Sequence, residues 1–209
     1  MTEALSPAQE CLVHLSAALA SRDASLLSGA LASAHHTADP RAVEEALLQS
    51  YLFLGYPTAL NAFADWRALT RRPAEPATLA DGDWGERGSR VCQAVYGGQY
   101  EGLRDNVRRL HADMEQWMVE EGYGKVLGRP GLALADRELC IAAILAVLGV
   151  PRQLYSHLRG ALNVGADETA VERALEIAAS LSTDQARRSA NETWAAVKRR
   201  SGSEDVPCS

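Results

Sequence analysis

The stretch RELCIAAILAVLGVPRQLYSHLRGALN, Arg137–Asn163, decides the fold of this chain. Asp136 stands before an apolar run of helical spacing, so we expect it to cap a helix from Arg137 to Leu148. Gly149-Val150-Pro151 interrupts that helix, and Pro151 begins a second one that runs to about Val164. Because the connection is short, the two helices are predicted to lie antiparallel.

The same helical spacing extends over most of the chain, and no stretch shows the alternation of a strand. Ser6, Asp23, Asp167 and Asp184 are the expected N-caps of four of the helices. Besides the two helices above, the pattern predicts helices over 7–20, 24–36, 42–54, 58–70, 86–95, 100–120, 169–180 and 185–200. The sequence therefore predicts an all-α fold.

Residues 9–66 resemble residues 137–194 at a constant shift of 128 without a gap. Glu10 falls on Glu138, and Trp66 falls on Trp194. Self-similarity at a fixed offset indicates a repeated structural unit. We expect two repeated antiparallel multi-helix units, a degenerate one over 1–70 and a fuller one over 89–200. A Pro/Gly-rich linker is predicted over 71–88 and a disordered tail over 201–209.

Composition narrows the class of protein. The 209 residues are 47% hydrophobic and 23% charged, as in an ordinary globular protein. The formal net charge of −6 argues against nucleic acid and anionic membrane as partners. No apolar run approaches a membrane span, and Met1-Thr2-Glu3-Ala4 lacks signal-peptide features, so a cytoplasmic location is expected. None of the cysteines lies within three residues of another, so no zinc or CxxC redox motif is predicted: Cys11, Cys92, Cys140 and Cys208.

His157 is the first candidate for chemistry. It shares a helix face with Gln153, and an imidazole titrates near neutrality, which suits proton transfer. The matching residues of the first copy are Gly29 and Ser25, so packing alone does not demand a ring at this position. The histidine therefore marks the second copy as the one that carries chemistry.

Glu138 is the second candidate, and two interpretations stay open for it. It is either the acid–base partner of His157 or a residue placed in a first helical turn to suit the helix dipole, as Glu10 is. In a simple antiparallel hairpin the two side chains are offset by several Å. Direct contact requires the helices to cross, and a bridging water is the alternative.

Residues 122–131 contain four glycines and one proline, so they cannot form a long regular helix. Such a segment either brings backbone close to a ligand or simply turns. Arg129 within it is the first choice to hold a carboxylate, ahead of Arg137, Arg152 and Arg159, which are alternatively solvated surface residues. Further candidates for substrate binding are Tyr123, Gln153 and His111, with Trp117 in the same region.

Three segments together resemble the carboxymuconolactone decarboxylase family. They are WMVEEGYGKVLGRPGL (117–132), RELC (137–140) and HLRGALN (157–163). The resemblance covers about 86–200, with 6–70 as a degenerate half copy. It implies an all-helical fold of the alkyl hydroperoxide reductase D type and a homo-oligomer, as a trimer or a hexamer-like assembly. The family includes 4-carboxymuconolactone decarboxylases and thiol peroxidases similar to alkyl hydroperoxide reductase D.

The thiol branch of this family uses a Glu, a CxxC pair and a His. With Glu138 and His157 in register, the two cysteine positions fall on Val150 and Gln153, so the dithiol is missing. The resemblance thus implies a carbon–carbon lyase, a cofactor-independent decarboxylase acting on 4-carboxymuconolactone or a related lactone or carboxylic acid. Neither cofactor nor metal is expected, because the conjugated lactone carbonyl accepts the electron pair that CO2 leaves behind.

In this hypothesis Arg129 orients the substrate carboxylate, His157 is the general acid and Glu138 sets the tautomer and charge of the imidazole. Two alternatives stay open. One is an antioxidant protein of the thiol branch, in which Cys140 is oxidised by peroxide. The other is a non-catalytic assembly or binding protein that has kept the fold.

Overall fold

An apolar helical hairpin lies at the centre of the protein. It consists of α7 (Leu134–Leu148) and α8 (Pro151–Asn163) in a computed structural model that describes residues 4–74 and 83–204. Every side chain from Leu139 to Ala146 is buried, as expected for a helix that is apolar all round. Gly149 takes φ 67°, a left-handed conformation that ends α7, and Pro151 then occupies the first turn of α8.

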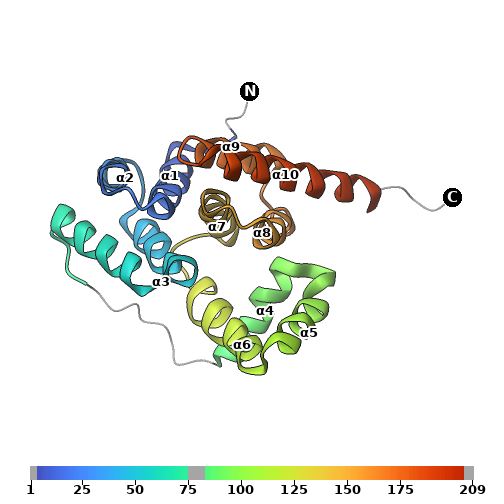
Figure 1. The fold of residues 1–209 in the computed structure, drawn as a ribbon. Helices are drawn as coiled ribbons and strands as arrows, with labels where there is room; N and C mark the ends of the chain where they lie inside the picture. The colour runs from blue at the N-terminus through green and yellow to red at the C-terminus, as the bar shows by residue number, and fades with distance from the viewer. Residues whose placement is uncertain (1–3, 75–82, 205–209) are drawn as a thin grey trace.

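Helices from both ends of the chain surround α7 (Figure 1). From the N-terminal side come α1 (Pro7–Ser21) and α3 (Pro40–Thr70), and α2 (Ala24–Thr37) packs on the outside of these two helices. From the C-terminal side come α9 (Glu168–Ala179) and α10 (Asp184–Glu204). Gly55, with φ 80°, bends α3 where the sequence predicts a break between two helices. Both termini of the described chain therefore contribute to the same core.

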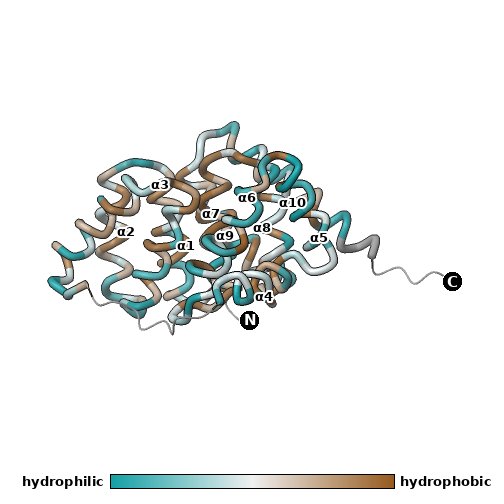
Figure 2. Tube along the Cα trace, turned by 90° about the horizontal axis from the view of Figure 1, so that it is seen from below, coloured by the Kyte–Doolittle hydropathy of each residue, from teal (hydrophilic) through white to brown (hydrophobic). Residues whose placement is uncertain are grey.

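The middle of the chain forms a second layer against α8 (Figure 1). It contains α4 (Trp84–Tyr96), the short 3-10 turn η1 (Gly97–Gln99), α5 (Tyr100–Leu110), α6 (Ala112–Trp117) and the π-helix η2 (Met118–Leu127). In Figure 2 the hydrophobic stretches gather around α7 in the middle of the molecule, and hydrophilic stretches lie toward its edges. This arrangement leaves α8 between the core and the second layer.

The all-α prediction is confirmed: no strand occurs in residues 4–74 and 83–204. None of the described helices is both long and apolar enough to cross a bilayer. Ser6 caps α1 in a capping box with Gln9, and Asp23 caps α2, both as predicted.

The predicted helix over 100–120 is wrong, because the chain turns at His111, which has extended backbone. The predicted loop over 122–131 is also wrong for residues 122–127, which continue η2. Glycine there serves helix packing. A Cβ on Gly124 would lie 2.2 Å from the carbonyl oxygen of Trp84, and one on Gly88 would lie 2.0 Å from that of Val119. These two glycines let α4 and η2 pack backbone against backbone.

Several predicted boundaries also differ. Asp136 does not cap α7, which begins at Leu134 after Ala133; its carboxylate accepts a hydrogen bond from Gln9 instead, at 2.7 Å. At the start of α10 the capping side chain is that of Thr183, which accepts from the amide of Ala186 at 3.2 Å. Residues 84–88 of the predicted linker belong to α4, and 201–204 of the predicted tail belong to α10. Residues 75–82 and 205–209 lie outside the described residues.

One hydrogen bond occurs at matched positions of the two predicted repeats. The indole nitrogen of Trp66 donates to Glu44 at 3.1 Å, and that of Trp194 donates to Glu172 at 3.1 Å. A cation also pairs with each carboxylate, Arg67 in the first case and Lys198 in the second. Such a pairing is what a duplicated unit would retain, and the duplication itself stays a prediction.

Candidate active site

Glu138 of α7 and His157 of α8 are in direct contact. Nδ1 of the imidazole lies 2.8 Å from Oε2 of the carboxylate, and Glu138 is fully buried while His157 is 7% exposed. Gly160 allows this approach, since a Cβ there would lie 2.8 Å from Glu138 Oε2 and 2.6 Å from a methyl group of Val95. The absence of a side chain one turn after His157 thus lets the two helices approach closely, and Glu138 and His157 meet without a bridging water.

The surroundings hold the imidazole in one orientation. The ring of Phe53, from α3, meets His157 edge-on at 5.7 Å between centroids, and the ring of Tyr96, from α4, does so at 6.4 Å. With Nδ1 turned toward Glu138, Nε2 is the ring nitrogen left for a ligand. Oε1 of Glu138 is buried and has no hydrogen-bond partner among the described residues. Glu138 is fully buried behind the ring, so the imidazole is the member of the pair that a ligand could contact.

His157 lines a cavity of about 540 Å³ between the core and the second layer. Most of the lining is apolar and comes from α3, α5, α6 and η2: Leu52, Phe53, Leu103, Val107, Met114, Trp117, Met118 and Leu127. Seven of the lining side chains carry polar groups: Tyr96, Glu121, Tyr123, Arg152, Gln153, Ser156 and His157. A largely apolar pocket with a few convergent polar groups is the usual form of a small-molecule site.

Two tyrosines form a hydrogen-bonded pair beside His157. The hydroxyl of Tyr123 donates to that of Tyr96 at 3.0 Å. Burial raises the pKa of both tyrosines above the ordinary value, so both remain neutral near pH 7. Because the Tyr96 oxygen accepts the hydrogen bond from Tyr123, its own hydroxyl hydrogen is left to donate to a ligand oxygen.

The structure brings Tyr123 and Gln153 into this cavity with His157, and Trp117 with them. It does not bring Arg129 or His111 there. His111 is exposed at the turn between α5 and α6 and is not among the lining residues. Arg152 is the arginine of the sequence candidates that lines the cavity.

Arg129 is instead part of a buried ion network. Its guanidinium donates to both oxygens of Glu45 on α3, at 2.9–3.0 Å. Arg137, which is fully buried, donates to the same carboxylate at 2.9 Å, to the Arg129 carbonyl at 3.0 Å and to Gln49 at 3.3 Å. One carboxylate thus joins α3, the segment after η2 and α7. Its partners explain why Arg129 is not available to a substrate.

Tyr96 and Phe53 both contact His157, and sequence reasoning missed both of them. Tyr96 lies one residue beyond the predicted end of its helix, and Phe53 lies in the first predicted repeat, where no chemistry is expected. The only signal available was their aromatic type. Their place beside His157 depends on how α3 and α4 pack around α8.

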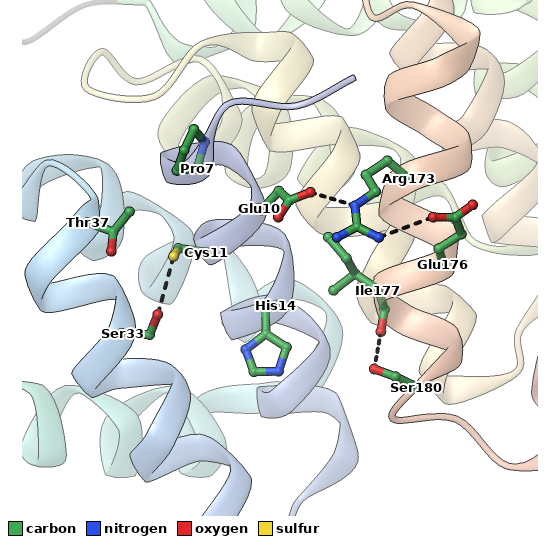
Figure 3. A pocket seen from close by; sticks show the side chains of 10 residues that line it. All are labelled: Pro7, Glu10, Cys11, His14, Ser33, Thr37, Arg173, Glu176, Ile177 and Ser180. Carbon is green, nitrogen blue, oxygen red and sulfur yellow. Dashed lines mark hydrogen bonds and ion pairs between the residues drawn. The ribbon is translucent and has the colours of Figure 1, made fainter. Parts of the chain in front are cut away.

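A second pocket, of about 500 Å³, lies between α1, α2 and α9 (Figure 3). It contains Glu10, which matches Glu138 in the repeat, but the partner of Glu10 is Arg173. That hydrogen bond lowers the pKa of the Glu10 carboxyl. Cys11 in the same pocket contacts Ser33, at 3.4 Å between Sγ and Oγ, and is half-buried. This pocket has no counterpart of the Glu138–His157 pair.

Metal and thiol chemistry find little support in the described residues. No group of three His, Cys, Asp or Glu side chains among them could hold a metal ion. Cys92 and Cys140 are buried, and burial raises the pKa of each thiol to about 12. Since the thiolate is the reactive form, both are poorly suited to react with peroxide near neutrality.

Two comparisons relate the chain to known proteins. The profile of the carboxymuconolactone decarboxylase family matches residues 112–196. Peroxisomal protein 2 of Schizosaccharomyces pombe (strain 972 / ATCC 24843) is 30% identical over 150 residues, which cover 68% of this chain and 69% of that protein. The segment that the profile matches includes Glu138 and His157 and excludes Phe53 and Tyr96.

Proposed function

This chain belongs to the carboxymuconolactone decarboxylase family, and we propose that it is a cofactor-independent enzyme that decarboxylates a lactone or related carboxylic acid. The observation that carries the proposal is the 2.8 Å contact of Glu138 with His157 at the wall of a largely apolar cavity. A histidine supported by a buried carboxylate is suited to move a proton to or from carbon.

In the proposed reaction His157 donates the proton and Glu138 balances its charge. Breaking the bond to the carboxylate releases CO2 and leaves an electron pair, which a conjugated carbonyl of the substrate accepts. The protonated imidazole of His157 donates the Nε2 proton to carbon, while the Glu138 carboxylate accepts a hydrogen bond from Nδ1 and balances the imidazolium charge. Solvent then returns a proton to Nε2, so each turnover consumes one proton and one carboxylate.

Two neighbouring groups complete the proposed site. The neutral Tyr96 hydroxyl donates to the carbonyl oxygen as negative charge develops on it, which is the kind of stabilisation that lowers such barriers most. Arg152, in the first turn of α8, orients the carboxylate in place of Arg129. Gln153 and Tyr123 remain substrate-binding candidates because both line the cavity.

The test is to incubate the purified protein with 4-carboxymuconolactone and then with related lactone acids, following CO2 release and enol-lactone formation. In D2O the product should carry one deuterium on carbon, since the proton of His157 exchanges with solvent. His157→Gln should lower kcat about 10²–10⁴-fold, because a positioned acid contributes that much.

His14→Gln is the matched control, since His14 lines the second pocket. It should leave kcat unchanged, and both variants should unfold near the wild-type temperature. Near wild-type turnover in His157→Gln would contradict the proposed role. The absence of CO2 from every acid tested would instead favour a non-catalytic binding protein.

A homo-oligomer and a cytoplasmic location stay predictions. Sedimentation analysis measures the first, and imaging of the tagged chain in its own cells measures the second.

A further inference from the structure

One wall of the cavity takes no part in the proposed chemistry. Leu103 and Val107 stand one turn apart on α5, and Met114 and Trp117 stand nearly one turn apart on α6. Met114 is 58% exposed and Trp117 is 60% exposed. Large apolar side chains that are exposed close to one another usually mark a binding surface. This wall is thus an apolar surface that opens onto the reacting groups.

The volume of the cavity is larger than a compact substrate would fill. Its volume of about 540 Å³ falls among pockets of about 300–1,000 Å³ that enclose drug-sized ligands. A small lactone placed against His157 and Tyr96 would leave the α5–α6 wall uncovered. An apolar body on the ligand would cover it and gain the corresponding hydrophobic free energy.

The charges that line the cavity suit one carboxylate rather than two. Arg152 supplies the cationic group among the side chains that line the cavity. Glu121 lines the cavity as well; its hydrogen bond from Lys125 lowers the pKa of its carboxyl, so it is negatively charged at neutral pH. A second ligand carboxylate would face apolar side chains or Glu121, and burying an unpaired charge is costly.

We propose that the cavity takes an organic acid with one carboxylate and an extended apolar body, which lies along Leu103, Val107, Met114 and Trp117. This inference rests on the proposed function for the placement of the carboxylate at Arg152 and of the reacting carbon near His157. It makes the ligand class an apolar monocarboxylic acid rather than a compact dicarboxylate.

The test is isothermal titration calorimetry of the full chain with hexanoate, octanoate and decanoate, and with the dicarboxylates of the same lengths. For the monocarboxylates we expect Kd to fall about two- to fourfold with each added methylene, because each buried methylene contributes hydrophobic free energy. Each dicarboxylate should bind at least about tenfold more weakly than the monocarboxylate of its length. A Kd independent of chain length, or tighter binding of the dicarboxylates, would overturn the proposal.

Variants locate the ligand. Met114→Glu should weaken decanoate binding about tenfold or more, while Leu60→Glu should not change it; Leu60 is 62% exposed on α3 and does not line the cavity. Arg152→Gln should weaken octanoate about tenfold and leave octanol unchanged. Equal effects of Met114→Glu and Leu60→Glu would overturn the placement on the α5–α6 wall.

The two proposals fail differently. If the dependence on chain length persists in wild type and in His157→Gln but no acid releases CO2, the decarboxylase proposal is wrong and the ligand class stands. If 4-carboxymuconolactone is decarboxylated but the Kd of the monocarboxylates does not depend on chain length, the ligand class is wrong and the decarboxylase proposal stands.

Discussion

Gly160 is the residue on which the contact between Glu138 and His157 depends. A methyl group there would lie 2.6 Å from Val95 and 2.8 Å from Glu138 Oε2, closer than real Cβ contacts. We therefore predict that Gly160→Ala lowers the free energy of unfolding by about 1–3 kcal/mol through overpacking. It should also lower kcat, because α8 must move away from the carboxylate.

Urea unfolding measures the first effect, and Gly102→Ala is its control. Gly102 lies in α5 and has no neighbour within 4 Å of an added Cβ, so alanine should stabilise that helix by up to about 1 kcal/mol. Equal responses of the two variants would show that the space at Gly160 is not restrictive.

The buried thiols predict a second property at the residue scale. Burial raises the pKa of Cys92 and Cys140 to about 12, from an ordinary value of 9.0. Near pH 8 both should react with a disulfide reagent far more slowly than Cys11, which is half-buried. Mass spectrometry of the alkylated protein identifies which thiols react, and rapid labelling of Cys140 in the folded state would revive the thiol alternative.

The raised pKa of the two buried thiols also makes the free energy of unfolding depend on pH. The folded state disfavours the thiolate, so this contribution is fully present below about pH 9 and is lost as the pH rises toward about 12. Replacing Cys140 by alanine should remove part of that alkaline loss, as measured by urea unfolding over this pH range.

At the scale of elements, the Glu45 carboxylate connects α3 to α7. It pairs with Arg129 and with Arg137, which is fully buried and whose pKa is lowered by that burial. Glu45→Gln should lower the free energy of unfolding by about 3–5 kcal/mol, since it leaves a buried cation without its counter-ion. Replacing Arg137 by methionine in the same chain should recover part of the loss.

The control is Glu10→Gln. Glu10 pairs with Arg173 where both side chains are more than a third exposed, so its loss should cost about 0–1 kcal/mol. Comparable losses in the two variants would mean that the Glu45 network is solvated in solution. Both are measured by chemical unfolding at the same salt concentration.

The helical pattern of the sequence predicts the bounds of some helices and not of others. Periodicity predicts α1, α2, α8 and α9 closely, because the bonds that form a helix join residues only four apart. The predicted capping bonds form at α1 and α2, whereas Asp167 precedes α9 without a capping hydrogen bond from its side chain. Helical pattern does not predict η2, because its glycines are more typical of a loop. Those glycines are compatible with a helix here because α4 packs directly on the backbone of η2.

At the scale of the whole molecule, the two parts of the chain share one core. The central α7 packs against α1 and α3 from one part and against α8, α9 and α10 from the other. We therefore predict that a fragment starting at residue 83 does not fold alone, since the faces of α7 toward α1 and α3 would be exposed.

Circular dichroism and amide exchange of this fragment test that expectation. Adding a fragment of residues 1–74 should restore helicity and protection, because the Glu45 network and the α1–α7 contact then form again. A folded, protected fragment without its complement would show that the second unit is an independent domain.

Local chemistry was enough to predict an all-α fold, most of the helix boundaries, and His157 and Glu138 as the candidate pair. The partners of these residues depend on packing. Arg137 reaches a carboxylate 92 positions away, and the cavity combines residues from Leu52 to His157. Helical periodicity reports which face of a helix is apolar, but not which helix covers that face. For this reason the sequence favours Arg129 as a carboxylate-binding residue, whereas packing pairs it with Glu45. Packing likewise decides that Tyr96, Phe53 and the apolar α5–α6 wall lie beside His157.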